Sequence, residues 1–124
     1  MQKKFVVFSH FIFIICLHLT IAGCQTAPLI GSEIEGNKLR DGVYEGFYRK
    51  GLNKAVVKVT ITGGRIVDVE CLEHLASWKG NKAEAIIPQR IVAEQSTRVD
   101  AVTGATNSSR VIMNAVQRAL EKAY

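Results

Sequence analysis

The chain contains 124 residues, which is enough for one domain, and carries a formal net charge of +5. Its basic residues are scattered rather than gathered into a patch, so the charge gives no basis for nucleic-acid binding. Of the three cysteines, only Cys71 lies beyond the first 24 residues, which excludes an internal disulfide and a multi-cysteine metal site in the folded part. We therefore expect no metal ligands.

Residues 1–23 have the pattern of a secretory signal. Lys3 and Lys4 form a basic head, and residues 5–19 form an apolar run that is short for a membrane span, which needs ~20 residues. The sequence Ile-Ala-Gly-Cys that ends at Cys24 is similar to a bacterial lipobox, which implies cleavage before Cys24 and lipid on that cysteine. An uncleaved N-terminal anchor is the alternative. Both interpretations predict an exported protein that is anchored to a membrane of the cell envelope.

Residues 24–38 contain Pro28, Gly31 and Gly36 and show no apolar period, so we expect a flexible tether there. The folded domain is then expected over residues 39–124. A domain of this size buries a modest core, and a bound cofactor would add to its stability.

Three segments alternate between apolar and polar residues as β-strands do, namely residues 43–48, 54–62 and 65–71. Gly46 lies inside the first of them. A glycine within a strand predicts that another group approaches the backbone closely at that point.

The turn between the second and third strands has two possible lengths. A two-residue loop, Gly63-Gly64, would pair Ile61 with Ile66, whereas a three-residue loop would pair Ile61 with Val67 and Val59 with Val69. A slip of one residue moves every side chain to the other face of a sheet. We prefer the three-residue loop because it brings the apolar faces of both strands to the same side.

The second half of the chain alternates between loop and helix. Residues 72–81 are expected to be irregular, and residues 82–95 have helical spacing, with Pro88 either kinking one helix or starting a second. Residues 96–107 hold too many turn formers for regular structure, and an apolar stripe over residues 111–123 predicts a last helix. The order of elements predicts an α+β domain, a small antiparallel sheet with helices on one face.

The loop over residues 99–110 combines hydroxyls, a glycine, an acid and a cation, a mixture that no core requires. It leads into the N-terminus of the last helix, where unpaired N–H groups and a partial positive charge favour phosphates. Gly104 permits a left-handed backbone, and Asp100 is placed to brace the turn. The simpler alternative is that Thr106 or Ser108 only caps the helix.

The segment from Asp100 to Thr106 resembles the Asp-x-x-Ser/Thr-Gly-Ala-Ser/Thr motif of FMN-binding domains. These include the exported flavoprotein subunits of Rnf-type and sodium-pumping quinone reductase complexes. Residues 41–46, the hairpin at 63–66 and the pair Ser108-Ser109 are also similar to that family. The resemblance covers roughly residues 41 to 122.

The resemblance implies that FMN is joined to Thr106 by a phosphoester bond, and that a flavin transferase takes it from FAD and releases AMP. The residues implied to frame the attachment point are Asp100, Thr103, Gly104, Ala105, Ser108 and Ser109. The protein is then an electron carrier that serves redox partner proteins and has no catalytic activity of its own, because the flavin carries the chemistry.

Two other interpretations stay open: FMN held without a covalent bond, and a structural lipoprotein without a cofactor. Trp78 is a candidate contact for the flavin ring because it is expected in a loop, and His74 lies four residues before it. Tyr44 and Tyr48 are further candidates, whereas burial is the expected role of Phe47.

Overall fold

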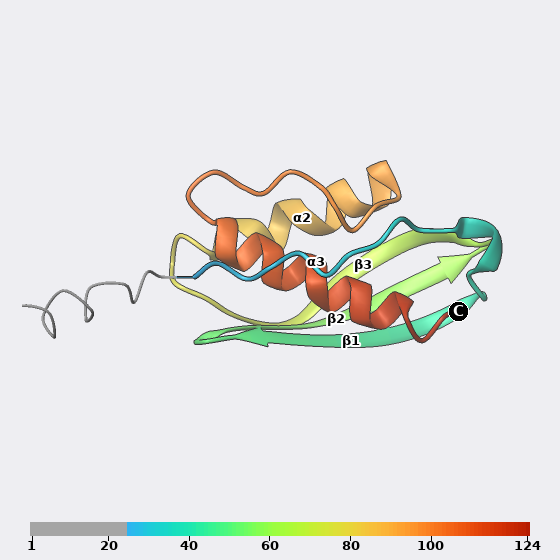
Figure 1. Ribbon diagram of the computed structural model, residues 1–124, viewed down its shortest axis with the longest axis horizontal. Coiled ribbons are helices and arrows are strands. Elements are labelled where there is room, and N and C mark those ends of the chain that lie inside the picture. The colour runs from blue at the N-terminus through green and yellow to red at the C-terminus, as the bar shows by residue number, and fades with distance from the viewer. Residues whose placement is uncertain (1–24) are drawn as a thin grey trace, which may run out of the picture.

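The computed structural model describes residues 25–124, so the leader and Cys24 lie outside the described residues. In chain order the elements are η1 (Gly36–Lys38), β1 (Gly42–Lys50), β2 (Asn53–Thr62), β3 (Arg65–Leu75), α2 (Asn81–Glu94) and α3 (Thr106–Leu120). The strands form an antiparallel sheet in the order β1-β2-β3, and both α-helices cover the same face of it (Figure 1). The predicted α+β fold is confirmed. Between residues 25 and 124, no helix has the length and apolar character to cross a membrane.

The core lies between the two α-helices and the inner face of the sheet. The inward residues of β2 are all buried, namely Ala55, Val57, Val59 and Ile61. At Gly46 of β1 the backbone of α3 comes so close that a β-carbon would overlap the carbonyl oxygen of Ala115 and lie 2.6 Å from the nitrogen of Ala119. The predicted close approach at Gly46 is confirmed, and α3 is the group that makes it.

The turn between β2 and β3 has two residues, so the predicted three-residue loop is wrong. Gly63 and Gly64 have φ angles of 59° and 69°, and Ile61 pairs with Ile66, as a two-residue hairpin with left-handed glycines requires. A β-bulge then inserts one residue into β3 and restores the expected pairing of Val59 with Val69. The bulge lets both apolar faces point inward without a longer loop.

The Gly-Gly turn is held by a neighbouring carboxylate. The backbone N–H groups of Gly63 and Gly64 donate to the two carboxylate oxygens of Asp41, at 2.9 and 3.0 Å. These hydrogen bonds lower the pKa of Asp41 below its ordinary value.

A second register shift, between Val56 and Val57, extends β3 as far as Leu75. His74 therefore lies in a strand, opposite Ala55, and the prediction of an irregular segment over residues 72–81 is wrong for its first part. Pro88 lies inside α2, which is a single helix.

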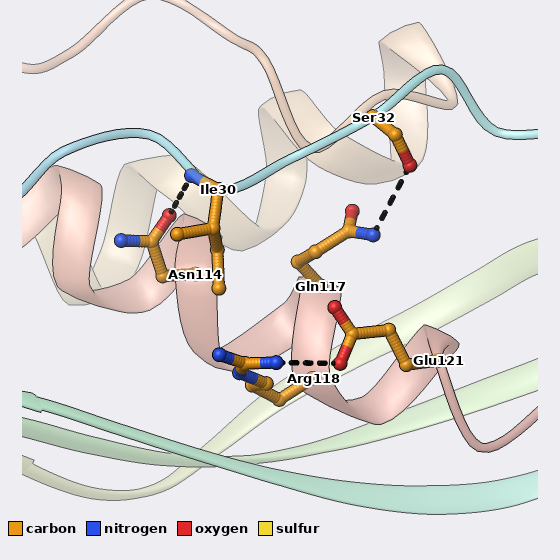
Figure 2. A network of polar contacts seen from close by, with 6 residues as sticks. All are labelled: Ile30, Ser32, Asn114, Gln117, Arg118 and Glu121. Atoms are coloured by element: carbon orange, nitrogen blue, oxygen red, sulfur yellow. Dashed lines mark hydrogen bonds and ion pairs between the residues drawn. The ribbon is translucent and has the colours of Figure 1, made fainter.

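Residues 26–35 run along α3 in an extended path, and we call this segment the strap (Figure 1). The amide of Asn114, which is fully buried, accepts from the N–H of Ile30 at 3.1 Å and donates to the carbonyl oxygen of Pro28 at 2.7 Å. One turn later the Gln117 amide donates to the Ser32 hydroxyl at 3.4 Å (Figure 2). The strap differs from the flexible tether that we predicted, because buried amides of α3 hold its backbone.

Candidate functional site

The loop that leads into α3 contains a tight turn at Gly104. The N–H of Ala105 donates to the carbonyl oxygen of Val102 at 2.9 Å, and Gly104 has a φ of 79°. Gly104 is therefore the third residue of a type II turn, a position whose positive φ favours glycine. A β-carbon on Gly104 would meet no atom of the described residues within 4 Å, so backbone conformation rather than crowding selects glycine, and no part of residues 25–124 covers the loop there.

Ser109 braces this loop from below. Its buried hydroxyl donates to the carbonyl oxygen of Ala105 at 2.8 Å and accepts from the N–H of Val102 at 3.0 Å. We expected Asp100 to act as the brace. Within residues 25–124 Asp100 contributes its carbonyl oxygen, which accepts from Arg90 at 2.6 Å, while its exposed carboxylate makes no hydrogen bond.

Thr106 is the first residue of α3 and is partly exposed. The N-cap position is occupied by Ala105, and no side chain of residues 25–124 makes a capping hydrogen bond there. Neither Thr106 nor Ser108 therefore acts as the cap that the simpler alternative required. The first N–H groups of the helix are left without a side-chain partner, and such groups bind anions.

Ser108 lies where three segments of the chain meet. Its hydroxyl donates to the side-chain oxygen of Asn53 at 3.2 Å, at the start of β2. A β-carbon on Gly80, before α2, would overlap the same hydroxyl oxygen. Asn53 and Gly80 were not predicted from the sequence, because no local pattern marks a contact between residues that lie 28 (Gly80) and 55 (Asn53) positions from Ser108.

A hollow of about 460 Å³ lies beside this junction. Its lining is mostly apolar and comes from the turn before β2 and from the segment after β3, namely Leu52, Asn53, Leu75, Ala76 and Ser77. Trp78 follows directly and is 76% exposed. The start of α3 thus combines uncapped N–H groups, an available hydroxyl and an adjoining apolar surface.

The other predicted aromatic contacts are divided between the two faces of the sheet. Tyr44 and Tyr48 are half-buried against the core, whereas Phe47 is 54% exposed on the opposite face. The expected burial of Phe47 is wrong. Side chains alternate along a strand, so Phe47 points away from the face on which its neighbour Gly46 packs against α3. The hydroxyl of Tyr44 donates to the carbonyl oxygen of Arg40 at 3.1 Å.

His74 is enclosed between β3 and the first turn of α2. Its side chain has no exposed surface, its Nδ1 lies 3.4 Å from a carboxylate oxygen of Glu84, and neither ring nitrogen has a hydrogen-bond partner within the described residues.

Burial, with a smaller contribution from the charge of Glu84, raises the pKa of Cys71 to about 11. Among residues 25–124 no three His, Cys, Asp or Glu side chains are grouped so as to hold a metal ion.

The domain that contains this loop is similar in sequence and in fold to known proteins. A family model described as an FMN-binding domain matches residues 51–121, more than half of the chain. Over 90 residues the chain is 37% identical to a protein of Treponema pallidum (strain Nichols), and the match covers 68% of this chain and 24% of that protein. A crystal structure of a protein from Clostridium perfringens has a similar fold, with a TM-score of 0.56, 21% identity, and coverage of 68% of this chain and 88% of that one.

Proposed function

Since the chain belongs to the FMN-binding domain family, we propose that its FMN is joined to Thr106 by a phosphoester bond and that the protein is an exported, membrane-tethered electron carrier. The position of Thr106 in the fold is the observation that supports it as the attachment site. It is the first residue of a helix that has no side-chain cap. A phosphate on its hydroxyl would lie among unpaired N–H groups at the positive end of the helix dipole.

The surroundings of Thr106 fit such a group. Open space lies above Gly104, which leaves access for both a cofactor and the enzyme that attaches it. The apolar hollow beside Ser108, which is lined in part by Leu75 and Ala76, offers a surface for the flat ring system. Bound FMN would supply one- and two-electron redox chemistry, while the protein supplies position and electrostatics.

Attachment requires a transferase with FAD as the donor. The Thr106 oxygen forms a bond to the phosphorus on the flavin side of FAD, the bond between that phosphorus and the bridging oxygen breaks, and AMP leaves with the bridging oxygen. The hydroxyl proton passes to the departing products. The role of this chain is to present the hydroxyl on a rigid helix start that Ser109 braces.

Intact mass after coexpression with a flavin transferase tests the attachment site. We expect a gain of about 440 Da, the mass of FMN less water, in the wild type and in Thr106→Ser, and no gain in Thr106→Val. Thr62→Val is the matched control, because Thr62 is an exposed threonine of β2 that has no part in the site, and it should keep the full gain. Yellow protein without a mass gain, which loses its flavin on denaturation, would instead support noncovalent binding. Protein with neither mass gain nor flavin absorbance would support a structural lipoprotein.

A further inference from the structure

Two loop tips lie at the same end of the molecule as Thr106, and each exposes an apolar side chain beside lysines. Leu52, in the turn that follows Lys50, is 82% exposed, and Trp78, which precedes Lys79, is 76% exposed. Both loops contact Ser108 in α3, one through Asn53 and the other through Gly80. We call the side chains of Lys50, Leu52, Trp78, Lys79 and Lys82 the tip surface.

The charge of the tip surface is positive. Lys50, Lys79 and Lys82 form no ion pair with another residue of the 25–124 range. The acid of the adjoining first turn of α2 is Glu84, whose carboxylate lies against His74. The Nζ of Lys79 lies 5.6 Å from the centre of the Trp78 ring, within the range of a cation–π contact.

The chain enters the described structure at this end as well. The guanidinium of Arg110, one turn after Thr106, donates to the Thr26 hydroxyl at 3.0 Å and to the Ala27 carbonyl oxygen at 3.2 Å. The described chain therefore begins beside the start of α3 and not at the far end, where the C-terminus lies (Figure 1).

We propose that the tip surface docks on an anionic lipid bilayer, with Leu52 and Trp78 in the interfacial region and the lysines among the headgroups. Tryptophan favours the membrane–water interface, and each lysine near an anionic surface contributes attraction. The proposal rests on the proposed membrane tethering and not on FMN attachment. In this orientation the Thr106 end of the domain faces the bilayer, and the FMN proposed on Thr106 would meet a donor or acceptor that is bound to the membrane.

Trp78 is the only tryptophan of the chain, so its fluorescence reports directly on the tip surface. The protein is isolated without FMN and with its native N-terminus, and is reconstituted into vesicles that contain brominated acyl chains. In equimolar phosphatidylglycerol and phosphatidylcholine we expect a blue shift and a loss of Trp78 emission. In phosphatidylcholine alone, and at high salt in either vesicle, we expect much weaker quenching.

Charge and position controls separate docking from tethering. Lys79→Glu with Lys82→Glu should abolish the quenching, whereas Arg65→Glu with Arg98→Glu, which changes the net charge equally away from the tip surface, should retain it. Trp78→Phe combined with Tyr124→Trp moves the only tryptophan to the opposite end and should remain unquenched.

Three results would overturn the proposal. Trp78 emission that is unchanged in protein floating with anionic vesicles rejects docking while tethering stands. Protein that does not float with the vesicles rejects tethering and docking together. Quenching that survives the double lysine variant rejects recognition of anionic lipid. None of these results depends on the mass test of Thr106.

Discussion

Asn114→Ala tests whether the strap is part of the folded domain. The Asn114 side chain is fully buried, and its amide makes two hydrogen bonds to the strap, one with Ile30 and one with Pro28. Each neutral hydrogen bond contributes about 1 kcal/mol, and the truncation also removes buried atoms, so we expect a loss of about 2 to 3 kcal/mol in the free energy of unfolding. For a domain of this size that corresponds to a fall in Tm on the order of 10 °C.

Urea denaturation followed by circular dichroism measures this loss. Arg118→Ala is the control, because Arg118 lies one turn further along α3 and pairs with Glu121 at the surface (Figure 2). An exposed pair of this kind contributes at most about 1 kcal/mol. If Asn114→Ala is as stable as Arg118→Ala, the strap adds nothing to the fold, and the domain begins near Leu39 as the sequence suggested.

Three further variants or titrations test other parts of the structure. Gly46→Ala should cost about 3 kcal/mol in urea denaturation, because its β-carbon overlaps the backbone of α3 at Ala115; a stability equal to wild type would contradict the close packing. The raised pKa of Cys71, about 11 against an ordinary 9.0, should slow its alkylation by iodoacetamide at pH 8 by ~100-fold relative to denatured protein, as measured by peptide mass spectrometry. Equal rates would place that thiol in water. The lowered pKa of Asp41 means that its carboxylate stabilises the fold above the ordinary value of 3.8 and that this contribution is lost as the pH falls through the lower, folded-state value. Asp41→Asn should therefore lower the Tm at pH 7 and match the wild type in strong acid, and a constant difference at all pH values would refute the assignment.

The strands illustrate which parts of the fold were predictable from the sequence. Alternation located β2 because one face of the strand is buried and the other is not. Alternation also required Val59 to face Val69, and that pairing is observed. The turn length that produces this pairing was not predictable, because a three-residue loop and a two-residue loop followed by a bulge both satisfy the same alternation. Two glycines with left-handed φ angles favour the short turn, and the sheet absorbs the extra residue one step later.

The strap was not predictable for a different reason. Its residues have no apolar period, and its hydrogen-bond partners lie 80 to 89 positions away, as in the pairs Ala27 with Asn107 and Glu35 with Tyr124. In the sequence, Asn114 and Gln117 lie outside the apolar stripe of the last helix, so they were expected to face solvent. The structure buries both amides, and the strap supplies the hydrogen-bond partners that buried amides need.

The strap changes what a lipid on Cys24 would do for the proposed electron carrier. A flexible tether over residues 24–38 would let the domain range over tens of ångströms from the membrane. With Thr26 bound to Arg110, the free chain between the lipid-bearing residue and the domain is two residues, a reach of about 7 Å. Arg110 lies one helical turn from Thr106, on the same α3 that would carry the flavin. If the lipid and the FMN are attached as proposed, a folded element would set the distance between anchor and cofactor, and a redox partner in the same membrane would meet the flavin without a search through solution.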